Sequence, residues 1–126
     1  MLRIYLAGGF HSGWQDAISS ALAEYECLDP SQHHIEDPAA YTAWDLAAIR
    51  RCDVVLANME ASNPGGYSLA LEVGFAKALG KFICFVDGTA NTQMSKYFEM
   101  IRQCSDVVVA SLDDALIILR RRSHQV

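Results

Sequence analysis

The stretch DVVLANMEASNPGGYSLALEVGFAKALGKFICFVD, residues 53–87, predicts two strands joined by a helix. Its two ends, DVVLANM (53–59) and KFICFVD (81–87), are nearly continuous apolar runs, which is typical of strands that a parallel sheet buries on both faces. Between them, a glycine-containing loop opens into a helical segment that is apolar almost all the way round except for Glu72 and Lys77. The stretch therefore indicates a fold built on a parallel sheet.

Strand and helix alternate on both sides of this stretch. Before it we predict a strand at RIYLAGG (3–9), an amphipathic helix with Ser12 as a possible N-cap, a short strand around Cys27 and Leu28, a loop to about Pro38, and a helix through AYTAWDLAAIRRC (40–52). After it we predict a helix near 93–103, a strand at 106–110 and a last helix from about 112 to 121. This alternation predicts a doubly wound α/β fold, flavodoxin-like or Rossmann-like, with helices on both faces of a five-stranded parallel sheet in the order 2-1-3-4-5.

Composition favours one globular domain that spans residues 1–126, because 52% of the residues are hydrophobic and 20% are charged. A net charge of −5 and a pI of about 5.2 provide no basic field for a phosphate backbone, so a nucleic-acid partner is disfavoured. The one basic run, Arg120–Arg122, fits a solvated last helical turn.

No apolar run approaches the roughly 20 residues of a membrane span, and the N-terminal apolar stretch is too short for a signal peptide. We therefore expect a cytoplasmic protein without a membrane partner.

The residues that often bind metals form no recognisable pattern. The cysteines are 20 or more residues apart and lie in or beside apolar segments, as small core side chains in a reducing compartment do: Cys27, Cys52, Cys84 and Cys104. The segment HHIED (33–37) fits a solvated loop better than a metal site, because helical ligand spacing and a second cluster are missing. Dinucleotide, P-loop and serine-hydrolase motifs are also missing. The sequence predicts neither a metal nor a cofactor.

The predicted sheet order places a ligand site where the loops after strands 1 and 3 meet, because ligands of such sheets bind beyond the carboxyl ends of the strands. These loops, residues 7–13 and 58–68, contain Gly8, Gly9 and Gly66, at which backbone can approach a ligand closely. Glu72 would lie at the mouth of the crevice if Ser68 is near the helix N-cap, and the positive helix end would then hold it ionised. From position alone, Glu72 is either an exposed glutamate that complements the helix dipole or a desolvated carboxylate that faces a ligand.

Two aromatic residues, Phe10 and Trp14, flank the first loop. Their rings could stack on a flat heterocycle such as a nucleobase. Helix packing explains Trp14 about as well.

Three segments, IYLAGGF (4–10), YTAWDLAAIRRCDVVLANME (41–60) and LEVGFAKALGK (71–81), resemble the nucleoside 2-deoxyribosyltransferase family, in that order and at similar separations. The resemblance covers residues 3–86 and implies a doubly wound domain that cleaves the N-glycosidic bond of a deoxynucleoside and transfers the sugar to another base or to water. It implies that Glu72 is the nucleophile and forms a covalent glycosyl intermediate, that Tyr5 orients its carboxylate, and that Asp45 contacts the base and donates a proton to it. Without the resemblance, Tyr5 could equally be a core aromatic and Asp45 a surface residue of a helix.

These implied roles require two carboxyl groups in different environments, because a nucleophile must be ionised and a general acid protonated at the same pH. Asp45 lies beside Trp44 in the sequence. We therefore expect Asp45 to be the more desolvated of the two carboxyl groups.

The chain departs from the family pattern around the implied nucleophile. Where the family usually has D-x-G-x-x-x-E, this sequence has NPGGYSLALE (63–72), without the Asp that helps to bind the sugar and with Ser68 at the expected Gly. The nearest substitutes are Asn63, Ser68 and Glu60, so the sugar preference stays open. Gly9 replaces the usual proline, which should loosen the first loop.

The resemblance also bears on partners and on phosphate. Family members complete their site with a partner subunit's residue, often an Asn, so we expect a homo-oligomer, with Asn91 as a candidate for that residue. Phosphate-binding relatives carry a Ser- and Arg-bearing first loop; here residues 11–13 could cradle an anion at a helix N-terminus, but no Arg accompanies them. A nucleoside is therefore favoured over a 5′-monophosphate. The alternative to an enzyme is a non-catalytic nucleoside- or nucleotide-binding sensor domain on the same fold.

Overall fold

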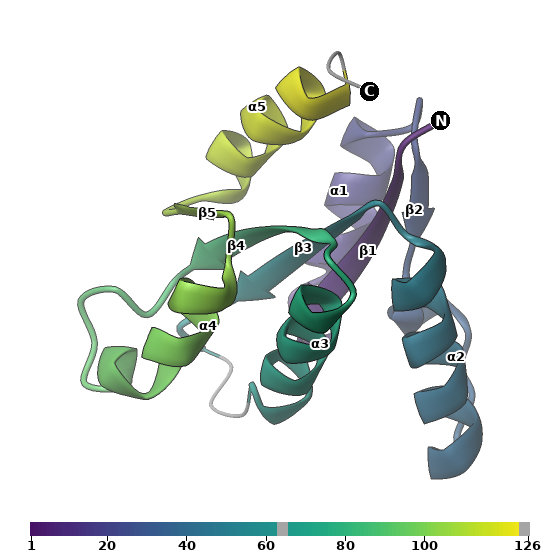
Figure 1. Cartoon of the computed structure of the whole chain (residues 1–126), viewed down its shortest axis with the longest axis horizontal. Helices are drawn as coiled ribbons and strands as arrows, with labels where there is room; N and C mark the ends of the chain where they lie inside the picture. The colour runs from purple at the N-terminus through teal and green to yellow at the C-terminus, as the bar shows by residue number, and fades with distance from the viewer. Residues whose placement is uncertain (63–65, 124–126) are drawn as a thin grey trace.

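Five parallel strands form one sheet in the computed structural model, which describes residues 1–62 and 66–123 (Figure 1). The strands are β1 (Arg3–Gly8), β2 (Glu26–Leu28), β3 (Val54–Met59), β4 (Phe82–Asp87) and β5 (Val107–Val109). Their order is β2-β1-β3-β4-β5, and every neighbouring pair is parallel. The predicted fold class and strand order are confirmed.

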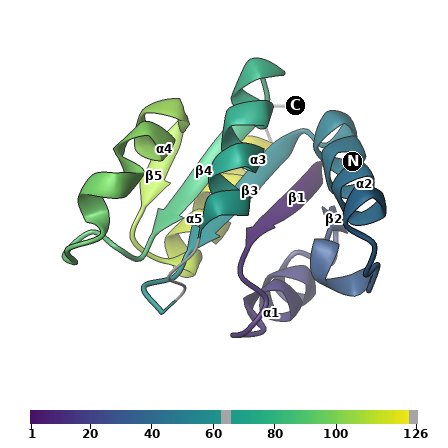
Figure 2. The same cartoon turned by 90° about the horizontal axis from the view of Figure 1, so that it is seen from below.

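Helices cover both faces of the sheet (Figure 2). The helices α2 (Pro38–Arg51), α3 (Tyr67–Ala78) and α4 (Glu99–Cys104) pack on one face, and α1 (Trp14–Ala21) and α5 (Leu112–Ser123) pack on the other. Successive strand side chains point to opposite faces. In β1, Tyr5 and Ala7 therefore belong to the core between the sheet and α2, α3 and α4, whereas Ile4 and Leu6 belong to the core between the sheet and α1 and α5. Both faces are apolar because each strand supplies side chains to two cores.

Two glycines cap the helices that border the crevice, and one of them, Gly13, stands where Ser12 was a possible N-cap. Helix α1 begins after Gly13 and α3 after Gly66, and both glycines have a left-handed backbone with φ near 75°. Ser68 is the second residue of α3 and so lies near the N-cap, two positions after Gly66, without being the cap itself. A residue with a Cβ would be strained at Gly66, where the added atom would also contact the end of Met59.

Strands β1 and β3 end side by side, with Gly8 paired to Asn58. A Cβ on Gly8 would lie 2.6 Å from the Asn58 carbonyl oxygen, and φ at Gly8 is 150°. Glycine is therefore required where the chain leaves β1 and passes close to β3.

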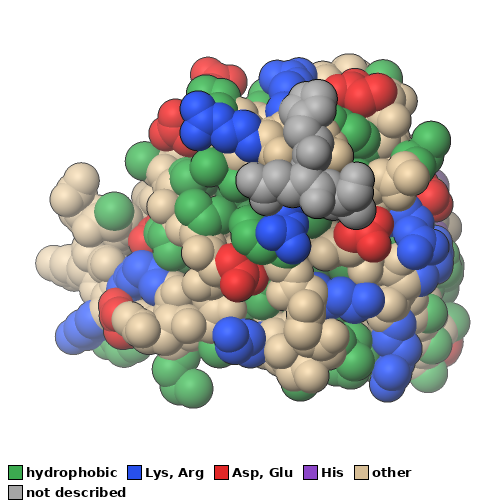
Figure 3. All heavy atoms as spheres, turned by 45° about the horizontal axis from the view of Figure 1, so that its top comes forward, with side chains coloured by type: hydrophobic (Ala, Val, Ile, Leu, Met, Phe, Trp, Pro, Cys, Tyr) green, Lys and Arg blue, Asp and Glu red, His purple; other side chains and the backbone are tan. Residues whose placement is uncertain are grey.

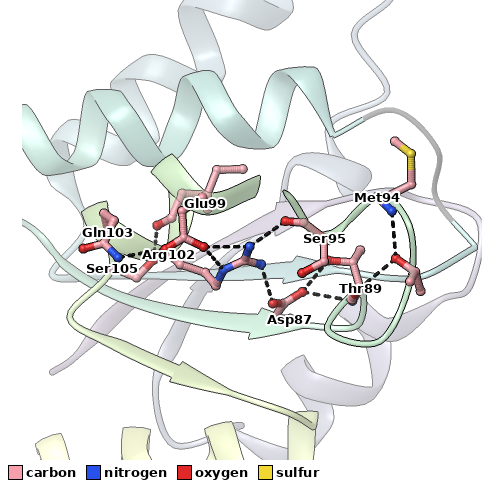
Figure 4. Close-up of polar contacts among 10 residues, drawn as sticks. Asp87, Thr89, Met94, Ser95, Glu99, Arg102, Gln103 and Ser105 are labelled. Atoms are coloured by element: carbon pink, nitrogen blue, oxygen red, sulfur yellow. Dashed lines mark hydrogen bonds and ion pairs between the residues drawn. The ribbon is translucent and has the colours of Figure 1, made fainter. Parts of the chain in front are cut away.

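The segment after β4 is fixed by a polar network around Arg102 (Figure 4). Its guanidinium donates to Asp87 Oδ2 at 2.8 Å and to the Glu99 carboxylate, while Thr89 donates to Asp87 from its backbone and its hydroxyl. The predicted helix near 93–103 is here a short 3₁₀ helix, η2 (Ser95–Phe98), followed by α4. A second 3₁₀ turn, η1 (Pro30–Gln32), lies in the loop after β2.

The surface is of mixed charge on the face shown in Figure 3, where Lys and Arg side chains lie among acidic and hydrophobic ones. The four cysteines are free, with Cys52 and Cys84 buried. None of the helices in the described part of the chain combines the length and the apolar character needed to cross a membrane.

Candidate active site

A cavity of about 530 Å³ opens at the carboxyl edge of the sheet, where the loops after β1 and β3 meet. Residues from β1, from the loops after β1 and β2, from α2 and from the start of α3 line it: Tyr5, Gly8, Gly9, Phe10, His11, Pro30, His33, Ile35, Tyr41, Asp45, Gly66, Tyr67, Ser68, Leu69 and Glu72. The cavity therefore lies where the predicted strand order places a ligand site, and it contains the three predicted catalytic residues.

Tyr5 and Glu72 form a buried pair at this cavity. The Tyr5 hydroxyl donates a hydrogen bond to Glu72 Oε2, from the middle of β1 to the second turn of α3. Burial, followed by the negative charge of Glu72, raises the pKa of Tyr5, so the phenol stays protonated and remains a donor. The Tyr5 side chain is fully buried, and its direction is set by the core around it. Tyr5 can therefore hold one carboxylate oxygen of Glu72 in a fixed position.

Glu72 is 8% exposed, and burial raises its pKa from the ordinary 4.5 to about 7. The hydrogen bond from Tyr5 lowers the pKa and the negative charge of Asp45 raises it, but both effects are smaller than that of burial. The expectation that the helix start holds Glu72 ionised is wrong, because Glu72 is the sixth residue of α3. It lies beyond the first-turn N–H groups that lack a partner within the helix.

Asp45 faces the same cavity from α2 and is paired with His33. Its Oδ1 lies 3.1 Å from His33 Nε2. The backbone N–H of Ile35 donates to His33 Nδ1 at 3.0 Å, so in the neutral ring the proton is on Nε2 and is donated to Asp45. Burial raises the pKa of Asp45, and the hydrogen bond and charge of His33 partly oppose that rise. His33 also packs edge-on against Trp44, with ring centroids 4.7 Å apart.

The prediction that Asp45 is more desolvated than Glu72 is wrong, because Glu72 is the more buried of the two. The Asp45 side chain is 24% exposed, whereas Glu72 is 8% exposed. The negative charge of Asp45 raises the pKa of both Glu72 and Tyr5, so the three groups interact electrostatically. The site thus contains a buried carboxyl group, that of Glu72, which is hydrogen-bonded to Tyr5, and a partly exposed one, that of Asp45, which is hydrogen-bonded to His33.

Most of the predicted substrate-binding residues line the cavity. Gly8, Gly9, Phe10, Gly66 and Ser68 are among them, and Phe10 is exposed there. Asn63 lies outside the described residues.

Trp14 belongs to the core instead. It is 4% exposed, packs from α1 against the sheet, and is not among the residues described as lining the cavity. Its indole N–H and the Gln15 side chain both donate to the Gly9 carbonyl oxygen at 2.9 Å. Trp14 and Gln15 therefore hold the first loop at Gly9, directly before Phe10.

Sequence reasoning missed two residues. His33 was assigned to a solvated loop, although it lines the cavity and bonds to Asp45. Glu60 was considered only as a substitute for the missing sugar contact, whereas its carboxylate accepts a hydrogen bond from Ser12 and joins the two loops. Both contacts depend on the folded course of loops, which residue spacing does not reveal. Among the described residues, no group of three or more His, Cys, Asp or Glu side chains is arranged to hold a metal ion.

A family model for nucleoside 2-deoxyribosyltransferases matches residues 4–98, which include Tyr5, Asp45 and Glu72. The chain belongs to this family. The match confirms the predicted family and, with it, the prediction of an enzyme of the nucleoside deoxyribosyltransferase type. None of the curated proteins compared with the chain matches it.

Solved structures of distant similarity have the same fold. A 2-deoxyribosyltransferase from Bacillus psychrosaccharolyticus is 18% identical with a TM-score of 0.73, covering 90% of this chain and 89% of that chain. A 2-deoxyribosyltransferase from Leishmania mexicana is 22% identical with a TM-score of 0.64, covering 77% and 71%. The CMP N-glycosidase BcmB from Clostridium botulinum is 20% identical with a TM-score of 0.60, covering 94% and 98%. At these identities the likeness supports the deoxyribosyltransferase fold assigned above.

Proposed function

We propose that this family member cleaves the N-glycosidic bond of a nucleoside, with Glu72 as nucleophile, Tyr5 as the residue that orients it and Asp45 as base contact and proton donor. The observation that carries the proposal is the buried Tyr5–Glu72 hydrogen bond beside a cavity that Asp45 also faces. An exposed glutamate at a helix start would need neither the burial nor the tyrosine. The sugar then passes to another base or to water.

In the first step a carboxylate oxygen of Glu72 attacks C1′ of the sugar, and the bond from C1′ to the base nitrogen breaks. The bonding electron pair leaves with the base, and the Asp45 carboxyl transfers its proton to a base nitrogen. A bound base would cover Asp45, which is now 24% exposed, and the loss of water would raise its pKa further. Substrate binding therefore favours the protonated form that the donor needs.

In the second step an acceptor attacks C1′ of the glycosyl ester and releases the Glu72 carboxylate. An acceptor base loses its proton to Asp45, and water would do the same, so that the enzyme returns to its starting protonation state. Tyr5 keeps its hydroxyl proton throughout, because its pKa is raised far above the working pH. Its hydrogen bond holds the carboxylate in both directions of the reaction.

The cavity wall suits a flat base and a small sugar. Phe10, Tyr41 and Ile35 line the cavity with aromatic or apolar side chains, which can pack on a heterocycle. Ser68 lines the wall at the start of α3 and is a candidate for a sugar hydroxyl contact, together with Asn63 in the preceding segment. These residues take the place of the family Asp in the proposal.

We also propose that the protein forms a homo-oligomer. Large apolar side chains are exposed on α3, η2 and α4: Tyr67, which also lines the cavity, Leu71, Tyr97 and Met100. Helices α3 and α4 pack against each other, and large exposed apolar side chains on neighbouring helices are typical of an interface. Light scattering tests the proposal, and a monomer at micromolar concentration would contradict it.

The function is tested by chromatography of reactions with a panel of deoxynucleosides, each with and without a free acceptor base. Base exchange or base release by the wild type that is lost in Glu72→Gln supports the proposal, with Glu24→Gln as a matched control because Glu24 is exposed on the surface. Binding of a nucleoside without turnover by the wild type would favour the non-catalytic sensor instead.

A further inference from the structure

The imidazole of His33, in the loop after β2, is held by three contacts. Its Nδ1 accepts the backbone N–H of Ile35 at 3.0 Å, its Nε2 lies 3.1 Å from Asp45 Oδ1, and its ring packs edge-on against Trp44. The side chain lines the cavity and is only 13% exposed. Because both ring nitrogens are engaged and the ring is packed, His33 presents a hydrogen-bond donor to Asp45 in a fixed direction.

The backbone of this loop has an uncommon conformation next to the imidazole. His34 has a φ of 52°, in the left-handed region that residues with a side chain rarely adopt. Among the described residues it is the only one other than glycine with a positive φ. It lies between His33 and Ile35, the two residues that the N–H to Nδ1 hydrogen bond joins. An unfavourable conformation of this kind persists only where surrounding contacts hold it, and here it accompanies the bond that orients the imidazole.

The two carboxyl oxygens of Asp45 have different surroundings. Oδ1 is bonded to His33, whereas no hydrogen bond to Oδ2 is found among the described residues. Asp45 lines the cavity and is partly exposed, so a ligand can reach its carboxyl group. A proton on this group is favoured on Oδ2, because Oδ1 already accepts the N–H of His33.

We propose that His33 is a positioning residue, whose Nε2–H holds Oδ1 of Asp45 and so directs the proton on Oδ2 to the leaving base. This inference rests on the function proposed above, because that function makes Asp45 the proton donor. As the bond from C1′ to the base nitrogen breaks, the proton passes from Oδ2 to the base and Asp45 becomes a carboxylate. The hydrogen bond from His33 stabilises this carboxylate, since hydrogen bonds to charged groups are stronger than those to neutral ones.

His33 itself neither gives nor takes a proton in this step. Its Nδ1 is occupied by the N–H of Ile35, and its Nε2 proton stays in the hydrogen bond to Asp45. This hydrogen bond lowers the pKa of Asp45, in opposition to burial, so Asp45 is a stronger acid toward the base than it would be without His33. The effect grows as charge develops on Asp45 in the transition state. Loss of His33 should therefore change kcat more than KM.

Two substitutions separate the two hydrogen bonds of the imidazole. In His33→Gln the side-chain amide nitrogen can take the place of Nε2 and donate to Asp45. In His33→Asn the amide oxygen can take the place of Nδ1 and accept from Ile35, but the side chain is too short to reach Asp45. His34→Asn is the matched control, because His34 is exposed in the same loop, is not among the described lining of the cavity, and Asn tolerates a left-handed backbone.

The test measures kcat and KM of the wild type and the three variants with the deoxynucleoside that the wild type turns over fastest. His33→Asn should lower kcat about tenfold or more, as expected when a proton donor is misplaced. His33→Gln should stay within about threefold of the wild-type kcat, because it keeps the donor to Asp45. His34→Asn should match the wild type, and KM should change little in all three variants.

An NMR titration of the Asp45 carboxyl carbon gives a second measurement that does not depend on turnover. The pKa of Asp45 should rise in His33→Asn and stay close to the wild-type value in His33→Gln. Equal losses of kcat and equal pKa values in these two variants would show that His33 only anchors the loop, and would overturn the proposed role.

Failure of this inference differs from failure of the proposed function. If Glu72→Gln is inactive but His33→Asn keeps the wild-type kcat, the proposed function stands and the role of His33 is refuted. If the wild type turns over no deoxynucleoside, the proposed function fails and this inference fails with it.

Discussion

The stability of a Glu72→Gln variant relative to the wild type should rise with pH between about 4.5 and 7 and stay level above pH 7. Burial raises the pKa of Glu72 from 4.5 to about 7 in the folded protein. A difference of this size between folded and unfolded states corresponds to about 3 kcal/mol, since each pH unit corresponds to about 1.4 kcal/mol. Glu72 is 8% exposed, so solvent screening reduces this figure little.

The sign follows from proton binding. The folded protein binds the Glu72 proton more tightly than the unfolded chain, so the contribution of this group to stability is complete below pH 4.5. It is lost as the pH rises, and the loss is complete once the pH passes about 7. Glutamine has the shape of the protonated side chain and can still accept the hydrogen bond from Tyr5, but it does not titrate. The variant therefore escapes this loss.

The assay is thermal or urea-induced unfolding of both proteins at pH 5 and pH 8. The stability of Glu72→Gln relative to the wild type should increase by about 2 to 3 kcal/mol between these two pH values, or by roughly 10 °C in the difference of the Tm values. Only the change of this stability difference with pH is interpreted, because replacing the carboxyl group by an amide adds a contribution to the free energy of unfolding that does not depend on pH. Glu24→Gln, at an exposed position, should show a flat difference. A difference for Glu72→Gln that is equally flat would refute the claim that this carboxylate is buried and carries a raised pKa.

Three other substitutions test the surroundings of the site. Tyr5→Phe removes the hydrogen bond that lowers the pKa of Glu72, so this pKa should rise by about one unit in an NMR titration of the carboxyl carbon; an unchanged value would contradict the bond. His33→Ala removes the hydrogen bond that opposes the rise in the pKa of Asp45, so that pKa should increase, and the same titration would show no movement if His33 does not contact Asp45 in solution. At Asp87, burial alone would raise the pKa, but the hydrogen bonds from Thr89 and Arg102 outweigh it and keep the pKa low. Arg102→Met should therefore destabilise the protein by about 2 kcal/mol at pH 7 in urea unfolding, and this loss should shrink as the pH falls through the lowered pKa of Asp87; a loss that is the same at every acidic pH would rule out a charge-based role.

The fold could be predicted because its signals are local. Buried parallel strands need continuous apolar runs and helices need apolar faces, and DVVLANM and KFICFVD show the first kind of signal clearly. Right-handed crossovers then leave few strand orders, so the crevice between β1 and β3 was predictable as well. The pairing of Tyr5 with Glu72, by contrast, entered through the family resemblance.

The remaining features of the site depend on three-dimensional packing. The sequence placed Ser68 near the helix N-cap without identifying the cap, which is Gly66 because the turn before α3 needs a left-handed residue. Because the helix begins two residues earlier than it would with Ser68 as its cap, Glu72 is the sixth residue of α3 and lies beyond the unpaired N–H groups of the helix start. Trp14 has an aromatic ring that could stack on a base, and only the packing of α1 against the sheet shows that this ring is in the core. His33 reaches Asp45 because the loop after β2 folds back on α2, and a loop leaves no periodic signal in the sequence.

The burial that makes Glu72 unfavourable for stability also favours the proposed reaction. A buried carboxylate with a pKa near 7 is a poorly solvated anion. When it attacks C1′, its negative charge passes to the leaving base, and the product is a neutral ester. The free energy that the fold loses by holding the charge in the free enzyme is therefore recovered in the covalent intermediate. The Tyr5 hydrogen bond limits this effect, because it stabilises the anion that must react. It is retained, we infer, since a carboxylate that is free to rotate would lose more through poor orientation than it would gain in reactivity.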